Sequence, residues 1–259
     1  MNLKYDAGTI AFKREQIKIK LFEQSANIKT VDFTKISDSD LYILYNLYDD
    51  IFLSSWFKCN FKGKIKFRLS KQLTRAAGNT TTRKNIVLIE PEDVEFVVKI
   101  SSNHLVNFDK AERDKFVGGL KANSRLDCLM LVFEHELCHV IEFLICKKSS
   151  CSKENFKNLI HDLFGHTEST HKLVSNNEAN YHQYGMLVGD CVSFEHDGKR
   201  LHGFINKINK LATVMSPSKF GKYVDKTGQR YTKYYVPMGC LDKEQKYQIL
   251  NINEQGEKL

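Results

Sequence analysis

A chain of 259 residues can form one large domain or two smaller ones, and 42% hydrophobic against 27% charged residues is typical of a folded protein. Its seven cysteines include no CxxC pair, which argues against a zinc ribbon or a disulfide framework and indicates a reducing compartment. No apolar run approaches the roughly 18 residues of a membrane helix, and residues 1–16 show no signal-peptide pattern. We therefore expect an intracellular protein, cytoplasmic or nuclear and not secreted, without a membrane partner.

The formal net charge of +8 favours a polyanionic partner such as DNA, because Lys and Arg side chains release counterions when they neutralise phosphates. The basic residues are spread along the chain instead of forming one block. A solvated, slightly basic surface is therefore an equally good interpretation.

The first half of the chain predicts helices and a small sheet. Residues 1–36 form an N-terminal extension without a clear period, in which 13–24 could be a strand or a short helix. Ser37 is a candidate N-cap for a helix of about four turns that carries apolar residues at helical spacing. Strand patterns follow at 64–70, 85–90 and 95–101, and residues 73–84 are expected to be an extended strand followed by a turn. Together they predict a sheet of three or four strands.

The second half begins with two predicted helices. Residues 123–147 are apolar nearly all round, which indicates a buried helix, and 153–164 form an amphipathic helix that Gly165 ends. The polar stretch 175–186 is interpreted as a linker. Residues 187–245 then predict a small β-barrel of four or five strands with a turn at His-Asp-Gly-Lys, followed by a C-terminal tail, 246–259.

The buried helix contains the sequence FEHELCHVIEF, residues 133–143, with an HExxH motif. Residues four apart lie on one face of a helix, so His135 and His139 can bind one zinc ion. Glu136 lies about 100° round the helix, where its carboxylate can act as general base toward a water molecule that the metal activates. A chance match with satisfied core histidines is the alternative. Ionisable side chains without partners are costly in a buried helix, which favours the zinc site.

A catalytic zinc ion needs a third protein ligand and one open position. The candidates after the motif are Cys151, His161, His166 and the more remote His171. Of these, His161 lies in the middle of a predicted helix and is interpreted as an ordinary surface residue.

Residues 41–171 resemble the SprT-like metallopeptidases, the family that includes Spartan. Four segments carry the resemblance in the family's order: LYNLYDDIF resembles its first helix, LTRAAGNTTTRKNIVLIEP its Ala-Gly strand and the next strand, LVFEHELCHVIEF its active-site helix, and NFKNLIHDLFGHTESTH the helix after the site. The resemblance implies zinc ligands at His135 and His139 and a catalytic base at Glu136. It also implies a wall of the substrate cleft that a substrate strand could extend, at Ala76, Ala77 and Gly78.

The family's third ligand is a histidine that opens the next helix, and this chain departs from that pattern. If Phe156 matches the family's aromatic residue, the histidine position falls on Ser152. Cys151 is one residue away, and a thiolate binds zinc well. We therefore expect Cys151 as the third ligand, with His166 as the alternative and a two-histidine site as a further possibility.

The C-terminal segment resembles SH3-like or KOW-like barrels, modules that commonly bind nucleic acid or protein tails. Near Phe204 it offers basic residues that could contact phosphates, although a solvated face fits them equally well: Lys199, Arg200, Lys207 and Lys210.

The sequence thus predicts an α+β protein with a zincin-like metallopeptidase core over residues 37–174, a mixed sheet packed on the HExxH helix, and an SH3-like β-barrel over 187–245. We expect a monomeric zinc peptidase whose substrates are DNA-associated or DNA-crosslinked proteins. The alternative is a non-catalytic nucleic-acid-binding protein with a degenerate peptidase-like core. A structural zinc site is disfavoured, because such sites usually have four protein ligands.

Overall fold

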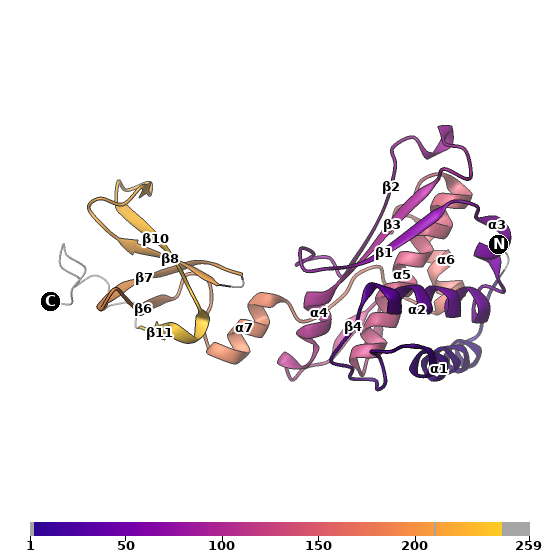
Figure 1. Ribbon diagram of the computed structural model, residues 1–259, viewed down its shortest axis with the longest axis horizontal. Coiled ribbons are helices and arrows are strands. Elements are labelled where there is room, and N and C mark those ends of the chain that lie inside the picture. The colour runs from indigo at the N-terminus through magenta and orange to yellow at the C-terminus, as the bar shows by residue number, and fades with distance from the viewer. Residues whose placement is uncertain (1–2, 210, 245–259) are drawn as a thin grey trace. The chain divides into compact units, whose positions relative to one another are not determined.

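The computed structural model describes residues 3–209 and 211–244, and the chain divides into two compact units after Ser175 (Figure 1). Lys210 and the C-terminal tail predicted at 246–259 lie outside the described residues. The protein is a mixed α+β structure, as predicted.

The N-terminal unit is built on a three-stranded sheet in the order β1-β3-β2. β1 (Lys64–Ser70) is parallel to β3 (Glu95–Ser101), whereas β2 (Gly78–Thr82) is antiparallel to β3 and lies at the edge of the sheet. The long helix α5 (Arg125–Cys146) packs against β2 and β3 (Figure 1). The remaining elements are α1 (Ala7–Gln24), α2 (Asp38–Ile51), α3 (Trp56–Asn60), α4 (Ser102–Val106), the hairpin β4 (Lys115–Val117) and β5 (Leu120–Ala122), α6 (Glu154–Phe164), and the 3-10 helices Ile86–Leu88 and Phe108–Lys110.

The helix boundaries follow the predicted signals. Ser37 and Asp40 form a capping box at the start of α2. The Ser124 side chain accepts a hydrogen bond from the backbone N–H of Asp127 at the start of α5. Gly165 ends α6 in the left-handed region with φ of 71°. The predicted helices over 123–147 and 153–164 and the strands over 64–70 and 95–101 are confirmed.

The strand predicted over 85–90 is wrong, because this segment contains a 3-10 helix, Ile86–Leu88. Asn85 adopts a left-handed conformation with φ of 62°, and the backbone N–H of Leu88 donates to its carbonyl oxygen at 2.8 Å. Ile86 is buried in the core, whereas the apolar side chains of Val87 and Leu88 are exposed, so only part of the apolar run that suggested a strand contributes to the core.

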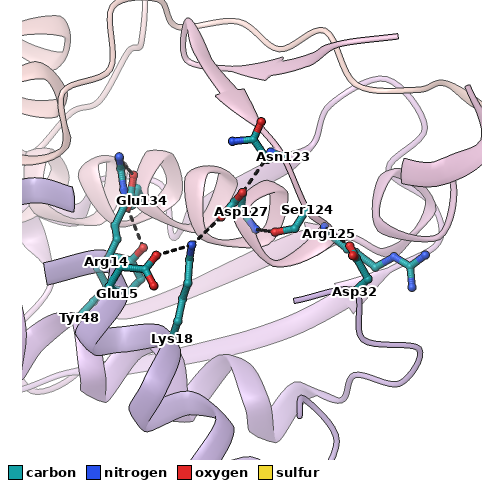
Figure 2. Close-up of polar contacts among 10 residues, drawn as sticks. All are labelled: Arg14, Glu15, Lys18, Asp32, Tyr48, Asn123, Ser124, Arg125, Asp127 and Glu134. Atoms are coloured by element: carbon teal, nitrogen blue, oxygen red, sulfur yellow. Dashed lines mark hydrogen bonds and ion pairs between the residues drawn. The ribbon is translucent and has the colours of Figure 1, made fainter. Parts of the chain in front are cut away.

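The N-terminal extension contains a long helix, α1, which packs against α2. Polar side chains join it to α5, as Figure 2 shows. Arg14 donates to both carboxylate oxygens of the fully buried Glu134, at 2.8 and 2.6 Å, and the Tyr48 hydroxyl donates to the same carboxylate at 2.7 Å. Lys18 forms an ion pair with Asp127 at 3.0 Å. Helix α1 is therefore part of the N-terminal unit, Met1–Ser175, whereas the sequence placed the start of this domain at residue 37.

Burial alone would raise the pKa of Glu134, but the charge of Arg14 and the hydrogen bonds from Arg14 and His166 lower it to about 2. A carboxylate whose pKa is lower in the folded protein stabilises the fold above its ordinary pKa, and the contribution is lost as the pH falls toward the folded value.

The C-terminal unit begins with α7 (Asn176–Tyr184), so the predicted linker over 175–186 is largely helical. It continues as a six-stranded antiparallel sheet in the order β11-β6-β7-β8-β10-β9, more strands than predicted. Asp197 and Gly198 form the predicted hairpin turn, with φ of 51° and 71°. The strands are β6 (Cys191–His196), β7 (Lys199–Ile208), β8 (Ala212–Pro217), β9 (Tyr223–Val224), β10 (Arg230–Val236) and β11 (Asp242–Lys243), and the 3-10 helix Met238–Cys240 lies between the last two.

Across the described ranges 3–209 and 211–244, the structure contains no helix with the length and hydropathy needed to span a membrane.

Replacing Glu134 with glutamine should lower the free energy of unfolding at pH 7 by about 3–5 kcal/mol, because Arg14 then lies largely buried without a compensating charge. The difference between the wild-type protein and the variant should shrink as the pH falls from about 4.5 to about 2, since the Glu134 carboxylate is protonated below about 4.5 in the unfolded chain but only near 2 in the folded protein. Urea unfolding at a series of pH values measures both effects.

Glu15→Gln is the matched control, because the Glu15 side chain is 63% exposed and its ion pair with Lys18 lies on the surface. That variant should change stability by less than about 0.5 kcal/mol. Equal losses for the two variants would contradict the role assigned to Glu134.

Candidate metal centre

Helix α5 places the two histidines of the HExxH motif side by side. The Nε2 atoms of His135 and His139 are 3.2 Å apart, and the rings lie 4.9 Å apart between centroids. Phe156 of α6 is fully buried and packs against both rings, with centroids at 4.9 Å from His135 and 4.3 Å from His139. The imidazoles are therefore held by packing as well as by the helix.

The tautomer of His139 follows from a chain of hydrogen bonds. The Ser149 hydroxyl donates to the buried carboxylate of Glu142 at 2.6 Å, and the backbone N–H of Ser150 donates to the same oxygen at 3.0 Å. Because the only hydroxyl proton of Ser149 is directed to Glu142, its oxygen must accept from Nδ1–H of His139, at 2.7 Å. Nε2 of His139 is then unprotonated, and its lone pair is directed toward His135.

The separation of the two Nε2 atoms fits a metal ion. Two nitrogen donors on one tetrahedral ion, with bonds of about 2.0–2.1 Å, lie about 3.3–3.4 Å apart. Without a metal, Nε2–H of His135 can donate to the lone pair of His139, and a cation bound by both nitrogens replaces that proton. Burial lowers the pKa of His135 to about 3, assisted by nearby histidines, and burial lowers the pKa of His139 to about 4. Both imidazoles are therefore neutral at pH 7, as metal binding requires.

Cys151 completes a group of three possible ligands. Its Sγ and the ligand atoms of His135 and His139 all lie within 4.8 Å of one another. α5 ends at Lys147 in a left-handed conformation, and the hydrogen bonds of Glu142 to residues 149 and 150 hold the following turn against the helix. This return of the chain brings Cys151 to the histidines before α6 begins.

His166 lies in a different environment from the three possible ligands. Its Nε2 hydrogen-bonds to Glu134 at 2.9 Å, so it belongs to the buried network of Arg14. Gly118 packs so closely over it that a Cβ there would lie 2.0 Å from Nδ1 of His166. α6 starts near the metal centre and is 11 residues long, roughly 16 Å, which carries His166 away from the turn that holds Cys151.

Glu136 lies in the same cleft as the histidines. Thr80 of β2 donates to its carboxylate at 2.6 Å, and Gly78 lies so close that a Cβ there would be 2.4 Å from Oε1. A glycine in the Ala-Gly strand is therefore needed for α5 to approach β2. Burial raises the pKa of Glu136 to about 7, although the hydrogen bond from Thr80 opposes the shift.

The cleft has a volume of about 350 Å³ and is open to solvent on one side. All three predicted wall residues line it, and they precede or begin the edge strand β2: Ala76, Ala77 and Gly78. His171, a remote ligand candidate in the sequence, also lines the cleft, but its Nε2 donates to the carbonyl oxygen of Arg75 at 2.9 Å. His161 is exposed, as expected for a surface residue.

Residues around the centre that the sequence did not single out are Ser149, Glu142 and Thr80. Glu142 follows His139 by three residues, so helical geometry places its side chain next to that histidine. A carboxylate three residues after a possible metal ligand in a buried helix could therefore have indicated that Glu142 supports His139. The Ser149 contact depends on the return of the chain after α5, which no local pattern predicts.

Three of the four basic residues predicted for the C-terminal unit lie on β7. Arg200 donates to Asp242 at 2.6 Å and to Ser193 at 2.9 Å, so its charge is compensated locally. Lys207 is exposed and pairs in register with Thr213 of β8. Lys199 is exposed at the hairpin end of β7, and Lys210 lies outside the described residues.

No protein-family model matches the chain, and comparison with curated proteins and with solved structures gives no match either.

Ser149→Ala and Glu142→Gln should each weaken metal binding by about 10- to 100-fold, because they remove the groups that fix the tautomer of His139. Competition for Zn²⁺ against a chromophoric chelator measures the change. Ser152→Ala is the control, since Ser152 is exposed and, in the described part of the chain, its hydroxyl bonds to Ser150 alone. An affinity loss as large in the control would contradict the proposed hydrogen-bond chain.

Cys151→Ser should abolish the thiolate-to-metal charge-transfer band of the Co²⁺-loaded protein and weaken metal binding tenfold or more, because a neutral hydroxyl is a poor ligand. His166→Ala should keep the band and lose fold stability, since His166 serves the Glu134 network. A band that persists in Cys151→Ser and disappears in His166→Ala would reverse the assignment.

Proposed function

We propose that the chain is a zinc-dependent peptidase of SprT-like type, with a zincin-like core in the N-terminal unit and an SH3-like barrel in the C-terminal unit. One observation carries the proposal: three possible metal ligands and the carboxylate of Glu136 line the same open cleft. The HExxH arrangement supplies two of these ligands and the carboxylate from adjacent turns of α5.

The donor set favours zinc and a catalytic site over a structural one. Two imidazole nitrogens and a thiolate are ligands that Zn²⁺ commonly takes. Structural zinc sites usually have four protein ligands, whereas the described residues group only three here. A set of three protein ligands leaves a position for water or substrate.

Glu136 has the features of a general base. When bound, Zn²⁺ lowers the pKa of water and polarises a carbonyl group. The Glu136 carboxylate accepts the proton of the attacking water and transfers it to the leaving amine. Thr80 orients the carboxylate through its 2.6 Å hydrogen bond, and the shielding by β2 keeps the basicity of Glu136 high enough for this transfer.

The edge of the sheet offers a way to bind an extended peptide. Among the residues that the structure describes, β2 pairs with β3 alone, and the residues of its first half line the cleft. Main-chain groups on the free edge of such a strand can pair with a substrate strand, which would place a peptide bond beside α5. The substrates would then be unfolded or extended protein segments.

We further propose that the substrates are proteins bound or crosslinked to DNA. The net charge of +8 supports this part, together with the resemblance of residues 41–171 to SprT-like peptidases. The non-catalytic alternative differs in its activity: such a protein would bind nucleic acid but would not cleave proteins attached to it.

Glu136→Gln should retain metal binding and fold but reduce peptide cleavage by several orders of magnitude, because an amide cannot accept the proton. The measurement is cleavage of an unfolded protein substrate and of a protein crosslinked to DNA, with metal content determined for each preparation. Glu23→Gln on the exposed end of α1 serves as the control and should cleave normally.

A Zn²⁺-loaded wild-type protein that leaves both substrates intact would contradict the peptidase proposal and favour the non-catalytic alternative. Equal cleavage by wild-type and Glu136→Gln proteins would remove Glu136 from the role of base.

A further inference from the structure

The net positive charge of the protein arises from one segment. Residues 199–233 contain nine Lys and Arg residues and one acidic residue, Asp225, a formal charge of +8. The rest of the chain then has 39 − 9 = 30 basic and 31 − 1 = 30 acidic residues. The basic residues, taken alone, are spread along the whole chain. Once acidic residues are counted, the entire excess lies in the segment from β7 to β10.

The sheet formed by this segment has two different faces. On β10, Tyr234 and Val236 contact the hydrophobic core of the unit. Because side chains alternate along a strand, Tyr231, Lys233 and Tyr235 lie on the opposite face.

Neighbouring strands add aromatic and basic residues to this second face. Tyr223 of β9 pairs in register with Tyr231, and Phe204 of β7 contacts the Tyr231 ring at 5.5 Å between centroids. Lys207 of β7 and Tyr235 of β10 pair with the same residue of β8, Thr213. We call this surface the aromatic face, and its members are Phe204, Lys207, Tyr223, Tyr231, Lys233 and Tyr235.

Contacts with neighbouring side chains hold the rings of Tyr231 and Tyr223, and the rings of Tyr223 and Tyr235 are accessible. The Tyr231 hydroxyl donates to Asp225 at 2.9 Å, and Nζ of Lys233 lies 4.0 Å from the centroid of the Tyr223 ring. The side chains of Tyr223 and Tyr235 are 44% and 66% exposed. Large aromatic side chains at a surface, without burial in the core, are available to stack against a planar ligand.

Several lysines around the aromatic face have uncompensated charge. Within residues 3–209 and 211–244, the structure gives no ion pair with a carboxylate for Lys207, Lys222 or Lys226. The one acidic residue of the segment, Asp225, is engaged by Tyr231 and Thr227. The surface thus combines positive charge with exposed rings.

We propose that the aromatic face binds single-stranded nucleic acid, with unpaired bases stacked on Tyr223 and Tyr235 and the phosphates contacted by the surrounding lysines. Every base has a face that can stack on an aromatic ring, whereas the bases of a duplex are already stacked on one another. The inference extends the proposed function by naming the nucleic-acid partner, but it depends only on the C-terminal unit and not on the metal centre.

The test measures fluorescence anisotropy of labelled 20-nucleotide oligothymidine and oligouridine with the full-length protein at several salt concentrations. The wild-type protein should bind the single strands more tightly than a 20-base-pair DNA duplex or a 20-residue polyglutamate. Tyr223→Ala and Tyr235→Ala should each weaken single-strand binding about tenfold, the usual scale for losing a base–aromatic stack. The ratio of the two single-strand affinities shows whether DNA or RNA is preferred.

Matched controls separate stacking from charge. Tyr181→Ala removes a tyrosine of α7 that is 46% exposed, lies in the same unit and is outside the aromatic face, and it should leave binding unchanged. Lys207→Gln should reduce the dependence of log affinity on log salt by about 0.7, as expected for one phosphate contact on a single strand. Lys20→Gln, on the exposed surface of α1, should not alter that slope.

Equal affinity for duplex and single strand, or equal binding by the tyrosine variants and the wild-type protein, would overturn the proposal. Tight binding of polyglutamate would do the same, because it would show that charge alone suffices. Cleavage of an unfolded protein without DNA tests the peptidase separately: a chain that cleaves but does not bind oligonucleotides refutes only the aromatic-face proposal, and the reverse result refutes only the peptidase proposal.

Discussion

The facing nitrogens of His135 and His139, 3.2 Å apart, are the constraint on which the N-terminal unit depends. Two neutral imidazoles whose Nε2 atoms face each other at this distance require either an N–H that one donates to the other or a cation bound by both, so the surrounding groups determine what the site can bind. Phe156 packs on the rings from α6, and Ser149 with Glu142 fixes the proton of His139 on Nδ1. The same turn that supplies Ser149 also carries Cys151 to the centre. The position of Cys151 and the tautomer of His139 thus both depend on the turn that follows α5.

Helix α5 carries two buried carboxylates with different roles, Glu134 and Glu136. Glu134 is fully paired, with Arg14, Tyr48 and His166 as partners, and its pKa lies well below the ordinary range. Glu136 is also buried, but within residues 3–209 and 211–244 its one side-chain partner is Thr80, and burial raises its pKa to about 7. A fully paired carboxylate stabilises the fold, whereas an under-compensated one in a cleft is typical of acid–base chemistry.

Much of this architecture could be predicted because its signals are local. Ser37, Ser124 and Gly165 mark helix ends through hydrogen bonds and a left-handed backbone, and the spacing of HExxH fixes two side chains on one helical face. The 3-10 helix at Ile86–Leu88 and the helix α7 were missed because apolar content and polar composition do not report backbone geometry. His166 was an ambiguous candidate, since only the tertiary contact with Glu134 separates it from the metal centre. The concentration of charge in β7–β10 was accessible from the sequence and required counting both signs.

X-ray absorption at the zinc edge of the metal-loaded protein tests the central claim most directly, because it reports ligand types and bond lengths around the ion. The account predicts four-coordinate zinc with one sulfur at about 2.3 Å, two imidazole nitrogens at about 2.0–2.1 Å and one light atom that no protein side chain supplies. The sulfur contribution should disappear in Cys151→Ser while the two imidazoles remain. A spectrum without sulfur in the wild-type protein, or one with four protein ligands, would contradict an open centre formed by His135, His139 and Cys151.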